Sequence, residues 1–563
     1  MFADARRVPE RTEIQTDVCV VGAGAAGITL AKHFSGRRTR VVLLESGGFE
    51  LDAETQQLCD GPNAGLPYFA LLASRLRYFG GTTGHWGGTC RPMEPEDFGA
   101  RPGVPRSGWP IGRADLDPYY GAAAELVGIR DMEWDLASWA RRSRFEPFDL
   151  GDRVQTRVGR LVRAKNRRWG ELYREDVRRA PDVTSYLYAN VTELETDETG
   201  RRVTRARAAT LGGNRFTVRA RWFVLAAGGI ENARLLLLSD RRHPRGLGND
   251  HDMVGRCFLE HPRFRGAVVV PARSSIESRF YTTHGAAGAD IEGYLAVAER
   301  RQVQERLVDV QIGIRPVFEG GFQDVKNAPD VVALKALGGE PSSGDLAEDV
   351  RKVAGDLGTW HAFTIPGAPL PVPYPEVAGK LLGSPDDRKA LVPRVLGDIA
   401  AFAYTKLVGS APVQRLDVIT RIASAPEPDS RVTLAGDRDA LGLRRAKLTW
   451  KLSPIDRRSV VRSLELLGAA VGAAGLGRLR LLVGEDDRSW PDDLQGAYHH
   501  MGTTRMSADP RDGVVDRNCR VHGVANLYVA GSSVFPTPGA GTPTMTLVAL
   551  ALRLGHHLDR EIA

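Results

Sequence analysis

The chain has 563 residues, 42% of them hydrophobic and 26% charged, which is the composition of a soluble globular protein. This length exceeds what one hydrophobic core can organise, so two domains are expected. The 76 lysines and arginines exceed the 69 aspartates and glutamates to give a net charge of +7, a small surplus that does not indicate a nucleic-acid partner.

The cysteines and the apolar segments bear on the compartment. Five cysteines are scattered without a CxxC pair, which argues against a zinc site or a disulfide framework and fits a reducing compartment, and no metal ligands are predicted. Arg6 and Arg7 have no apolar region behind them, so no signal sequence is predicted. The apolar runs near 465–483 and 544–554 are too short to span a membrane. We therefore expect a cytoplasmic protein without a transmembrane segment.

The first predicted unit is a strand, a glycine-rich turn and a helix. The apolar run at 17–21 predicts a buried strand, and the sequence Gly-Ala-Gly-Ala-Ala-Gly follows at 22–27. A helix is expected next, and then a second strand at 40–44 that ends at Glu45. A GxGxxG motif between strand and helix, with an acidic residue about 20 positions on, is typical of dinucleotide binding.

Each motif residue has a physical role in this interpretation. Gly22 permits the tight turn, Gly24 lets a pyrophosphate approach the backbone, and Gly27 lets helix and strand pack closely. Glu45 would accept hydrogen bonds from a ribose diol. The motif alone does not distinguish FAD from NAD.

A second glycine-rich stretch, GGTTGHWGGTCRP, occupies residues 80–92 with His85 and Trp86 at its centre. Five glycines within nine positions indicate backbone packed closely against something flat or charged. A core turn with a hydrogen-bonded histidine is the alternative interpretation, and it stays open.

The middle of the chain predicts further helices and strands. A helix is expected at 116–126, and the basic run at 157–168 has the spacing of a helix with a solvated basic face. Strand-like patterns follow at 184–194, 203–211 and 218–229, and the last of these ends in small residues before a helix that starts at 231. This second strand–turn–helix unit suits another strand that ends beside the same ligand.

From about residue 262 to residue 487 the pattern changes. Alternating strands are separated by long connections, with a proline-rich segment at 366–377 and a helix expected at 386–406. The predicted strands lie at 266–270, 291–297, 308–314, 431–434 and 445–452. A mainly antiparallel sheet with covering helices, forming a separate substrate-facing domain, is expected.

The C-terminal stretch, residues 498–554, combines YHHMGTTRM with a strand, a glycine turn and a long apolar helix. The strand at 527–530 runs into Gly531 and Ser532, and the helix starts near Thr544. A strand that ends in glycine and leads to a helix N-terminus is suited to bind an anion or a cofactor.

Together these segments resemble the glucose–methanol–choline (GMC) family of flavoenzymes. The matching segments are DVCVVGAGAAG…LLESGG at 17–48, GGTTGHWGG at 80–88, VLAAGGIENARLLL at 224–237, HHMGTTRM at 499–506, and NLYVAGSSVFPT…PTMTLVALALRL at 526–554. Within the family the chain looks most like bacterial pyranose-oxidase-like enzymes that act on sugars or glycosides. The resemblance implies FAD as cofactor, a substrate domain over the flavin, and oxidation of a CH–OH group to a carbonyl.

The fold class implied is α/β, with a Rossmann-like FAD-binding domain assembled from discontinuous segments and an α+β substrate domain with a mainly antiparallel sheet. The FAD-binding domain is expected to comprise residues 1–101, 185–261 and 488–563. Residues 102–184 would form a connecting helical segment, and residues 262–487 the substrate-binding domain.

Two catalytic positions follow from the resemblance. The family's base stands three positions before the Gly-Thr of its motif, which here is His499, and histidine suits this role because it titrates near neutral pH. The next residue, His500, would point the other way in an extended segment. The family's second residue is histidine or asparagine before the last Pro-Thr, where this chain has Thr542, with one donor and a shorter reach.

The remaining cofactor contacts are carried over from matched positions. They are Gly22, Gly24, Ala25, Ala26, Gly27, Glu45, Ser46, Gly81, Thr82, His85, Trp86, Gly87, Val191, Ala227, Gly228, Asn232, Gly531, Ser532, Pro543 and Thr544. Some relatives attach the flavin covalently through a histidine at the position of His85, while others do not, so both forms are considered.

The leading hypothesis is an FAD-dependent oxidoreductase acting on a small alcohol such as a sugar, glycoside or cyclitol, with oxygen or another electron acceptor. Oxidase and dehydrogenase activity both stay open, as does the oligomeric state. Thr542 motivates an alternative, a flavin-containing lyase or isomerase. A nicotinamide-dependent enzyme would need a second nucleotide fingerprint, which the sequence lacks.

Overall fold

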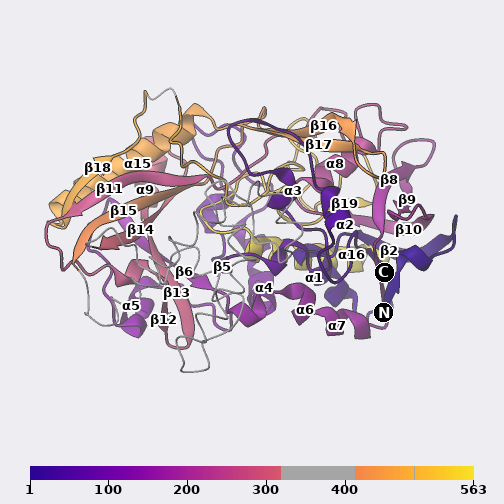
Figure 1. Cartoon of the computed structure of the whole chain (residues 1–563), viewed down its shortest axis with the longest axis horizontal. Helices are drawn as coiled ribbons and strands as arrows, with labels where there is room; N and C mark the ends of the chain where they lie inside the picture. Colours follow the sequence, from indigo (N-terminus) through magenta and orange to yellow (C-terminus); the bar gives the residue numbers. More distant parts are fainter. Residues whose placement is uncertain (319–411, 487–488) are drawn as a thin grey trace, which may run out of the picture.

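The computed structural model describes residues 1–318, 412–486 and 489–563. The proline-rich segment at 366–377 and the helix predicted at 386–406 lie outside the described residues. Figure 1 shows one sheet at the right with both chain termini, and a second sheet at the left under a long helix. A mixed α/β fold, as predicted, is therefore confirmed.

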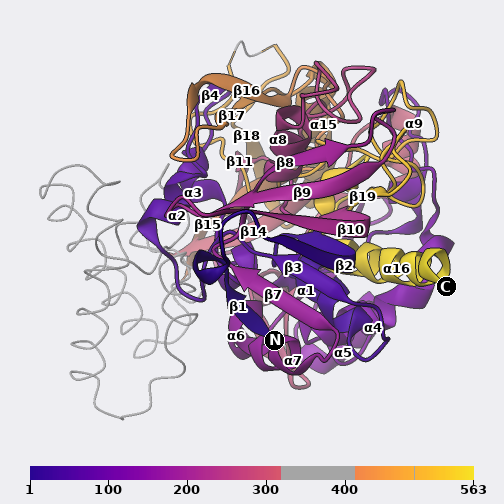
Figure 2. The same cartoon turned by 90° about the vertical axis from the view of Figure 1, so that its right-hand side faces the viewer.

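The first sheet joins strands from the beginning, middle and end of the chain (Figure 2). Its order is β1-β7-β3-β2-β10-β9-β8, and β19 also pairs with β10. The strands are β1 (Phe2–Asp4), β7 (Val183–Leu187), β3 (Val41–Leu44), β2 (Glu13–Val21), β10 (Arg215–Leu225), β9 (Val203–Ala209), β8 (Asn190–Thr196) and β19 (Leu527–Val529). The pairings among β1, β7, β3, β2, β10 and β19 are parallel, and β9 pairs with β10 and β8 in antiparallel fashion.

The predicted strand at 184–194 is in fact two strands, β7 and β8. The chain turns between them at Tyr188, whose φ of 60° lies in the left-handed region. Strand β7 lies between β1 and β3, and β8 forms the opposite edge of the same sheet, next to β9. The prediction of strand structure was therefore right, but the turn at Tyr188 was missed.

The unit β2-α1-β3 forms as predicted, with helix α1 at Ala25–Phe34. Gly22 has a φ of 101°, a conformation that favours glycine. A Cβ on Gly27 would lie 1.9 Å from the carbonyl oxygen of Gly22, so only glycine allows the helix to approach the turn this closely.

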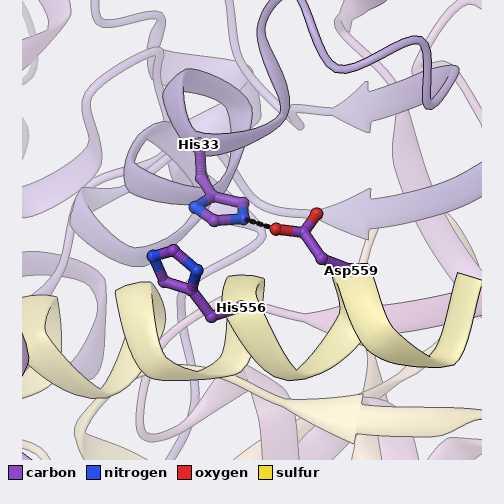
Figure 3. Close-up of side chains that lie close together, drawn as sticks. All are labelled: His33, His556 and Asp559. Atoms are coloured by element: carbon purple, nitrogen blue, oxygen red, sulfur yellow. Dashed lines mark hydrogen bonds and ion pairs between the residues drawn. The ribbon is translucent and has the colours of Figure 1, made fainter. Parts of the chain in front are cut away.

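The C-terminal helix α16 (Thr544–Ile562) packs against α1, and Figure 3 shows a polar contact between them. His33 Nε2 lies 2.9 Å from Asp559 Oδ2, and the ring of His556 lies edge-on to that of His33. Arg37 also contacts Asp559 (Nη1–Oδ2, 3.3 Å). Because Asp559 is shared between two partners, we interpret this cluster as a contact that holds the first and last parts of the chain together.

The second sheet has the order β18-β11-β15-β14-β13-β6-β5, with β12 paired to β13, and its pairings are antiparallel. Helix α15 (Pro454–Ala473) packs on it. Its strands are β18 (Gly477–Leu481), β11 (Arg263–Pro271), β15 (Val413–Ile422), β14 (Val310–Phe318), β13 (Ala289–Val297), β6 (Val154–Leu161), β5 (Thr89–Cys90) and β12 (His284–Ala286).

Strand β6 corrects one prediction, because the basic run at 157–168 was expected to be helical. Its first part is a strand that pairs with β13 along its whole length. The arginine spacing suggested a helix, but Val154 and Val158 are buried and Arg157 forms an ion pair with the buried Asp309 (2.7 Å). Tertiary pairing overrides local spacing here, so residues 102–184 are not purely helical.

A third, three-stranded sheet joins distant segments in the order β16-β17-β4. Strands β16 (Arg431–Arg438) and β17 (Arg444–Trp450) form a hairpin, and β4 (Asn63–Gly65) pairs with β17 in parallel. The segment expected to serve the substrate domain therefore contacts the N-terminal part of the chain directly.

The other helices lie around these sheets. Helices α4 (Asp117–Val127) and α8 (Glu231–Leu238) occur where they were predicted. The others are α2 (Ala53–Gln57), α3 (Leu71–Ser74), α5 (Leu136–Ser143), α6 (Trp169–Leu172), α7 (Arg174–Arg179) and α9 (Glu299–Glu305). Among the helices of the described residues, none has the length and apolarity needed to cross a bilayer.

Candidate active site

A cavity of about 1260 Å³ is bordered by the first sheet on one side and by strands β11, β13, β14 and β15 on the other. Every residue predicted to form the site lines this cavity except Gly27 and Asn232. Segments separated by several hundred residues in sequence, including those of His85 and His499, thus line one cavity.

The two exceptions lie directly behind the cavity wall. Gly27 is the close-packing position described above, and Asn232 is fully buried. The Asn232 side chain accepts a hydrogen bond from the Ala227 amide (2.8 Å) and donates one to Ser533 Oγ (2.9 Å). It therefore joins the ends of β10 and β19, and the geometry assigns it a positioning role rather than a lining one.

The N-terminus of α1 faces the cavity without a side-chain cap. Its N-cap residue is Gly24, and a Cβ placed on Gly24 would meet no heavy atom within 4 Å. The first backbone N–H groups of a helix lack partners inside the helix and carry partial positive charge. This end of the cavity can therefore hold an anionic group such as a pyrophosphate.

Glu45 lies next to this turn and is buried. Its carboxylate accepts hydrogen bonds from the amides of Ala23 (2.8 Å) and Gly47 (3.0 Å). Burial raises the pKa of Glu45, and these hydrogen bonds oppose that shift. The side chain thus holds the glycine-rich turn in place while it lines the cavity.

The second glycine-rich stretch forms one wall of the cavity. Trp86 Nε1 donates a hydrogen bond to the Arg167 carbonyl (2.9 Å), which fixes the indole ring. The His85 ring lines the cavity, and burial, followed by the charge of Arg168, lowers the pKa of His85 to about 4. His85 is therefore neutral at pH 7.

His499 lies close to a second histidine, His261, that sequence reasoning missed. The two Nδ1 atoms are 2.8 Å apart, and His261 Nε2 lies 2.7 Å from the carbonyl oxygen of Gly539. Burial lowers the pKa of His261 to about 4, so the ring is neutral at pH 7 and carries one proton.

These contacts determine where the protons sit. A carbonyl only accepts, so His261 Nε2 carries the proton and His261 Nδ1 is an acceptor. His499 Nδ1 must then be the donor in the pair, which leaves the lone pair of a neutral His499 on Nε2. Burial, followed by the neighbouring His261 ring and then by the charges of Arg421 and Arg263, holds the pKa of His499 well below its ordinary value. The result is a neutral imidazole in the tautomer required of a base.

Glu260 orients both histidines through the backbone. Its carboxylate accepts hydrogen bonds from the amides of His261 (2.8 Å) and His499 (2.9 Å) and from the Tyr68 hydroxyl. The sequence signal was the Glu-His-Pro triplet at 260–262, which stands at the expected domain boundary and was not interpreted as part of the site.

Thr542 and His500 occupy different surroundings from His499. The Thr542 hydroxyl donates a hydrogen bond to the Thr89 carbonyl, so its only proton is already used. The His500 ring is buried near Phe258 and Tyr68, and burial lowers its pKa to about 3. Within the described part of the chain, neither side chain is hydrogen-bonded to a second histidine as His499 is.

The chain is similar to known oxidoreductases. Residues 426–551 match the family model described as GMC oxidoreductase. The chain is 22% identical to the fructose dehydrogenase large subunit of Gluconobacter japonicus over 96% of this chain and 97% of that protein. It is 24% identical to the 2-methyl-1,2-propanediol dehydrogenase of Mycolicibacterium austroafricanum, over 98% and 96% respectively.

The C-terminal part of the chain thus matches the GMC oxidoreductase family model, and the two relatives above, which align along nearly the whole chain, are both dehydrogenases. The solved structure of a formate oxidase covers 98% of this chain and 99% of its own at 15% identity, with a TM-score of 0.50, which supports the fold alone. The predicted family and the predicted oxidoreductase class are confirmed.

Proposed function

We propose that this chain uses FAD to oxidise a CH–OH group of a sugar, glycoside or cyclitol to a carbonyl, with His499 as the base. The observation that carries the proposal is the hydrogen-bonded chain from the Gly539 carbonyl through His261 to His499. That chain leaves a lone pair on a neutral histidine in the same cavity as the GxGxxG turn.

The residues around the cavity fit FAD. The uncapped N-terminus of α1 suits the pyrophosphate, and Glu45 is close to that turn as a ribose partner. Helix α16 also begins at the cavity without a side-chain cap, at Pro543 and Thr544, and would face the flavin ring. When bound, FAD would accept the hydride equivalent that leaves the carbinol carbon.

The chain's own residues would handle the proton. His499 Nε2 accepts the hydroxyl proton as the carbonyl forms, and His261 keeps the ring in the required tautomer. The N-terminus of α16 favours negative charge that develops nearby. Thr542 has a supporting role in this proposal, since its hydroxyl fixes the start of α16 to Thr89.

The domain assignment remains part of the proposal. The first sheet, with residues from 1–101, 185–261 and 488–563, would bind FAD, and the second sheet would contact the substrate. Two relatives support a sugar or glycoside substrate, the fructose dehydrogenase above and a paromamine 6'-oxidase of Streptomyces fradiae that is 24% identical over 95% of this chain.

An anaerobic panel of sugars, glycosides and cyclitols tests the proposal by loss of the oxidised flavin absorbance. At least one member should bleach the flavin, and His499→Ala should slow that reduction by orders of magnitude while FAD stays bound. His556→Ala, at an exposed histidine outside the cavity, is the matched control and should reduce at the wild-type rate. Conversion of substrate without any bleaching would instead support a lyase or isomerase.

A separate measurement concerns His85, whose neutral ring lines the cavity and could carry a covalent bond to the flavin. Precipitation of the protein in acid gives the result directly. Yellow colour in the supernatant excludes the bond, and colour in the pellet that His85→Ala abolishes demonstrates it.

A further inference from the structure

Three arginines on neighbouring strands of the second sheet line the cavity beside His499. We call Arg263 of β11, Arg421 of β15 and Arg315 of β14 the arginine triad. Arg263 and Arg421 are direct cross-strand partners, although like charges in that position are destabilising. An arrangement that places like charges together inside a protein needs a reason.

The triad has no carboxylate partner in the described part of the chain. Arg263 donates to the neutral amide of Gln495 (3.2 Å), and Arg421 donates to that of Gln311 (3.2 Å). Among the ion pairs of the described residues, none includes Arg263, Arg315 or Arg421.

Three other arginines on the cavity wall are neutralised. Arg75 and Arg77 both pair with Glu231, at 2.6 and 2.7 Å, and Arg234 pairs with Asp439 at 2.6 Å. The fold therefore supplies counter-ions to these three side chains and none to the triad. Arg167, which also lines the cavity without an ion pair among the described residues, stands apart from the triad and donates to the Val162 carbonyl (2.7 Å). Burying a guanidinium without a counter-ion costs free energy, so three unpaired arginines at one place indicate that a ligand supplies the missing negative charge.

The acidic groups near the triad are too few to balance it. Asp417, the cross-strand partner of Arg315, is already paired with Arg265 and Arg415. Glu292 lies close enough to Arg315 and Arg421 to feel both charges, yet burial raises its pKa. The carboxylate of Glu260 already accepts hydrogen bonds from three donors. Burial and the neighbouring arginines lower the pKa of Arg263 to about 10, which is the signature of an uncompensated cation.

The triad is also connected to the base. Residue 495 pairs with Arg263 through its backbone as well as its side chain, and it precedes His499 by four positions in the same segment. A ligand group bound by the triad would therefore be held at a fixed place relative to His499.

We propose that the arginine triad binds an oxyanion of the substrate, so that the substrate is an acidic sugar or polyol carrying a carboxylate or a phosphate ester. Guanidinium groups match both oxyanions with paired, charge-assisted hydrogen bonds. The carbinol to be oxidised would lie on the same molecule, next to His499. This inference rests on the proposed function and narrows its substrate class.

The test uses the FAD-loaded full chain and three probes: methyl glucoside, D-glucuronate and glucose 6-phosphate. Binding is measured by calorimetry at low and high salt, and flavin reduction is followed anaerobically. At least one anionic probe should bind about tenfold tighter than methyl glucoside, and high salt should weaken that binding. The two anionic probes distinguish a carboxylate site from a phosphate site.

Arg421→Gln should weaken binding of the anionic probe by about ten- to a hundredfold and change methyl glucoside binding less than twofold. Because Arg421 is uncompensated, the ligand-free variant should also melt at a higher temperature than the wild type. Arg480→Gln is the matched control, since Arg480 is exposed on strand β18 of the same sheet and outside the cavity. Arg315→Gln serves as the second variant if Arg421→Gln does not fold.

The outcomes separate this inference from the proposed function. Anionic probes that bind no better than methyl glucoside, or equally well to wild type and to Arg421→Gln, overturn the inference. If neutral sugars then reduce the flavin, the proposed function stands without it. Salt-sensitive anion binding that Arg421→Gln removes supports the triad even where no probe reduces the flavin.

Discussion

His261→Leu should impair flavin reduction although His261 is not expected to touch the substrate. The substitution removes the Nδ1 atom that accepts the proton of His499 Nδ1 at 2.8 Å. The His499 N–H would then be buried without a partner. The ring can relieve this by moving its proton to Nε2, and that tautomer has no lone pair where the substrate hydroxyl lies.

The magnitude follows from the lost hydrogen bond. A buried donor left without a partner costs about 1–3 kcal/mol, and about 1.4 kcal/mol corresponds to a tenfold change in an equilibrium. The competent tautomer should therefore become about 5- to 150-fold less populated relative to the other. We expect the rate of flavin reduction to fall by the same factor, with little change in the substrate concentration needed for half-saturation.

Stopped-flow reduction by saturating substrate under anaerobic conditions measures this rate. His261→Asn is the informative partner variant, because the Asn amide oxygen can accept from His499 Nδ1 and should restore part of the rate. Retention of FAD and an unchanged melting temperature would separate tautomer control from misfolding. A wild-type rate in His261→Leu would refute the assignment of the lone pair to Nε2.

Two further predictions concern residues near the same segment. Thr542→Val removes the hydroxyl that donates to the Thr89 carbonyl, so it should lower the free energy of unfolding by about 1 kcal/mol, measured in urea. The rate of flavin reduction should change less than about fivefold. A loss of about a hundredfold in that rate would show instead that Thr542 contacts the substrate. The fold lowers the pKa of His500 to about 3, from about 6.5 in the unfolded chain. Between these two values the unfolded chain binds a proton at His500 and the folded chain does not. The free energy of unfolding therefore falls as the pH falls from about 6.5 towards 3, by at most about 1.4 kcal/mol per pH unit. His500→Gln should reduce the slope of unfolding free energy against pH between pH 6.5 and 4.5, while His85 and His261, whose pKa values are also lowered, keep part of it. An unchanged slope would contradict this account.

Sequence reasoning reached the elements whose signals are local. The turn at Gly22 needs a residue that tolerates positive φ, and the start of α16 follows from an apolar helix behind a Pro-Thr pair. Such signals are contained in a few adjacent residues. The predicted helices at 116–126 and from 231 are present for the same reason.

The features that were missed depend on contacts across the chain. His261 acquires its importance only from His499 and Gly539, which lie more than 230 residues away in sequence. Strand β6 forms because β13 pairs with it, against a local pattern that suggested a helix. The triad likewise depends on the register between β11 and β15, which no single segment specifies.

The triad and the base are coupled through charge, and this gives the two proposals a common consequence. The charges of Arg421 and Arg263 contribute to the lowered pKa of His499, after burial and His261. An oxyanion bound by the triad would offset those charges and raise the pKa of His499, making Nε2 a stronger base only when substrate is present. A neutral substrate would leave the base weak. The same side chains would then select an acidic substrate by its binding and again by the rate at which its proton is removed.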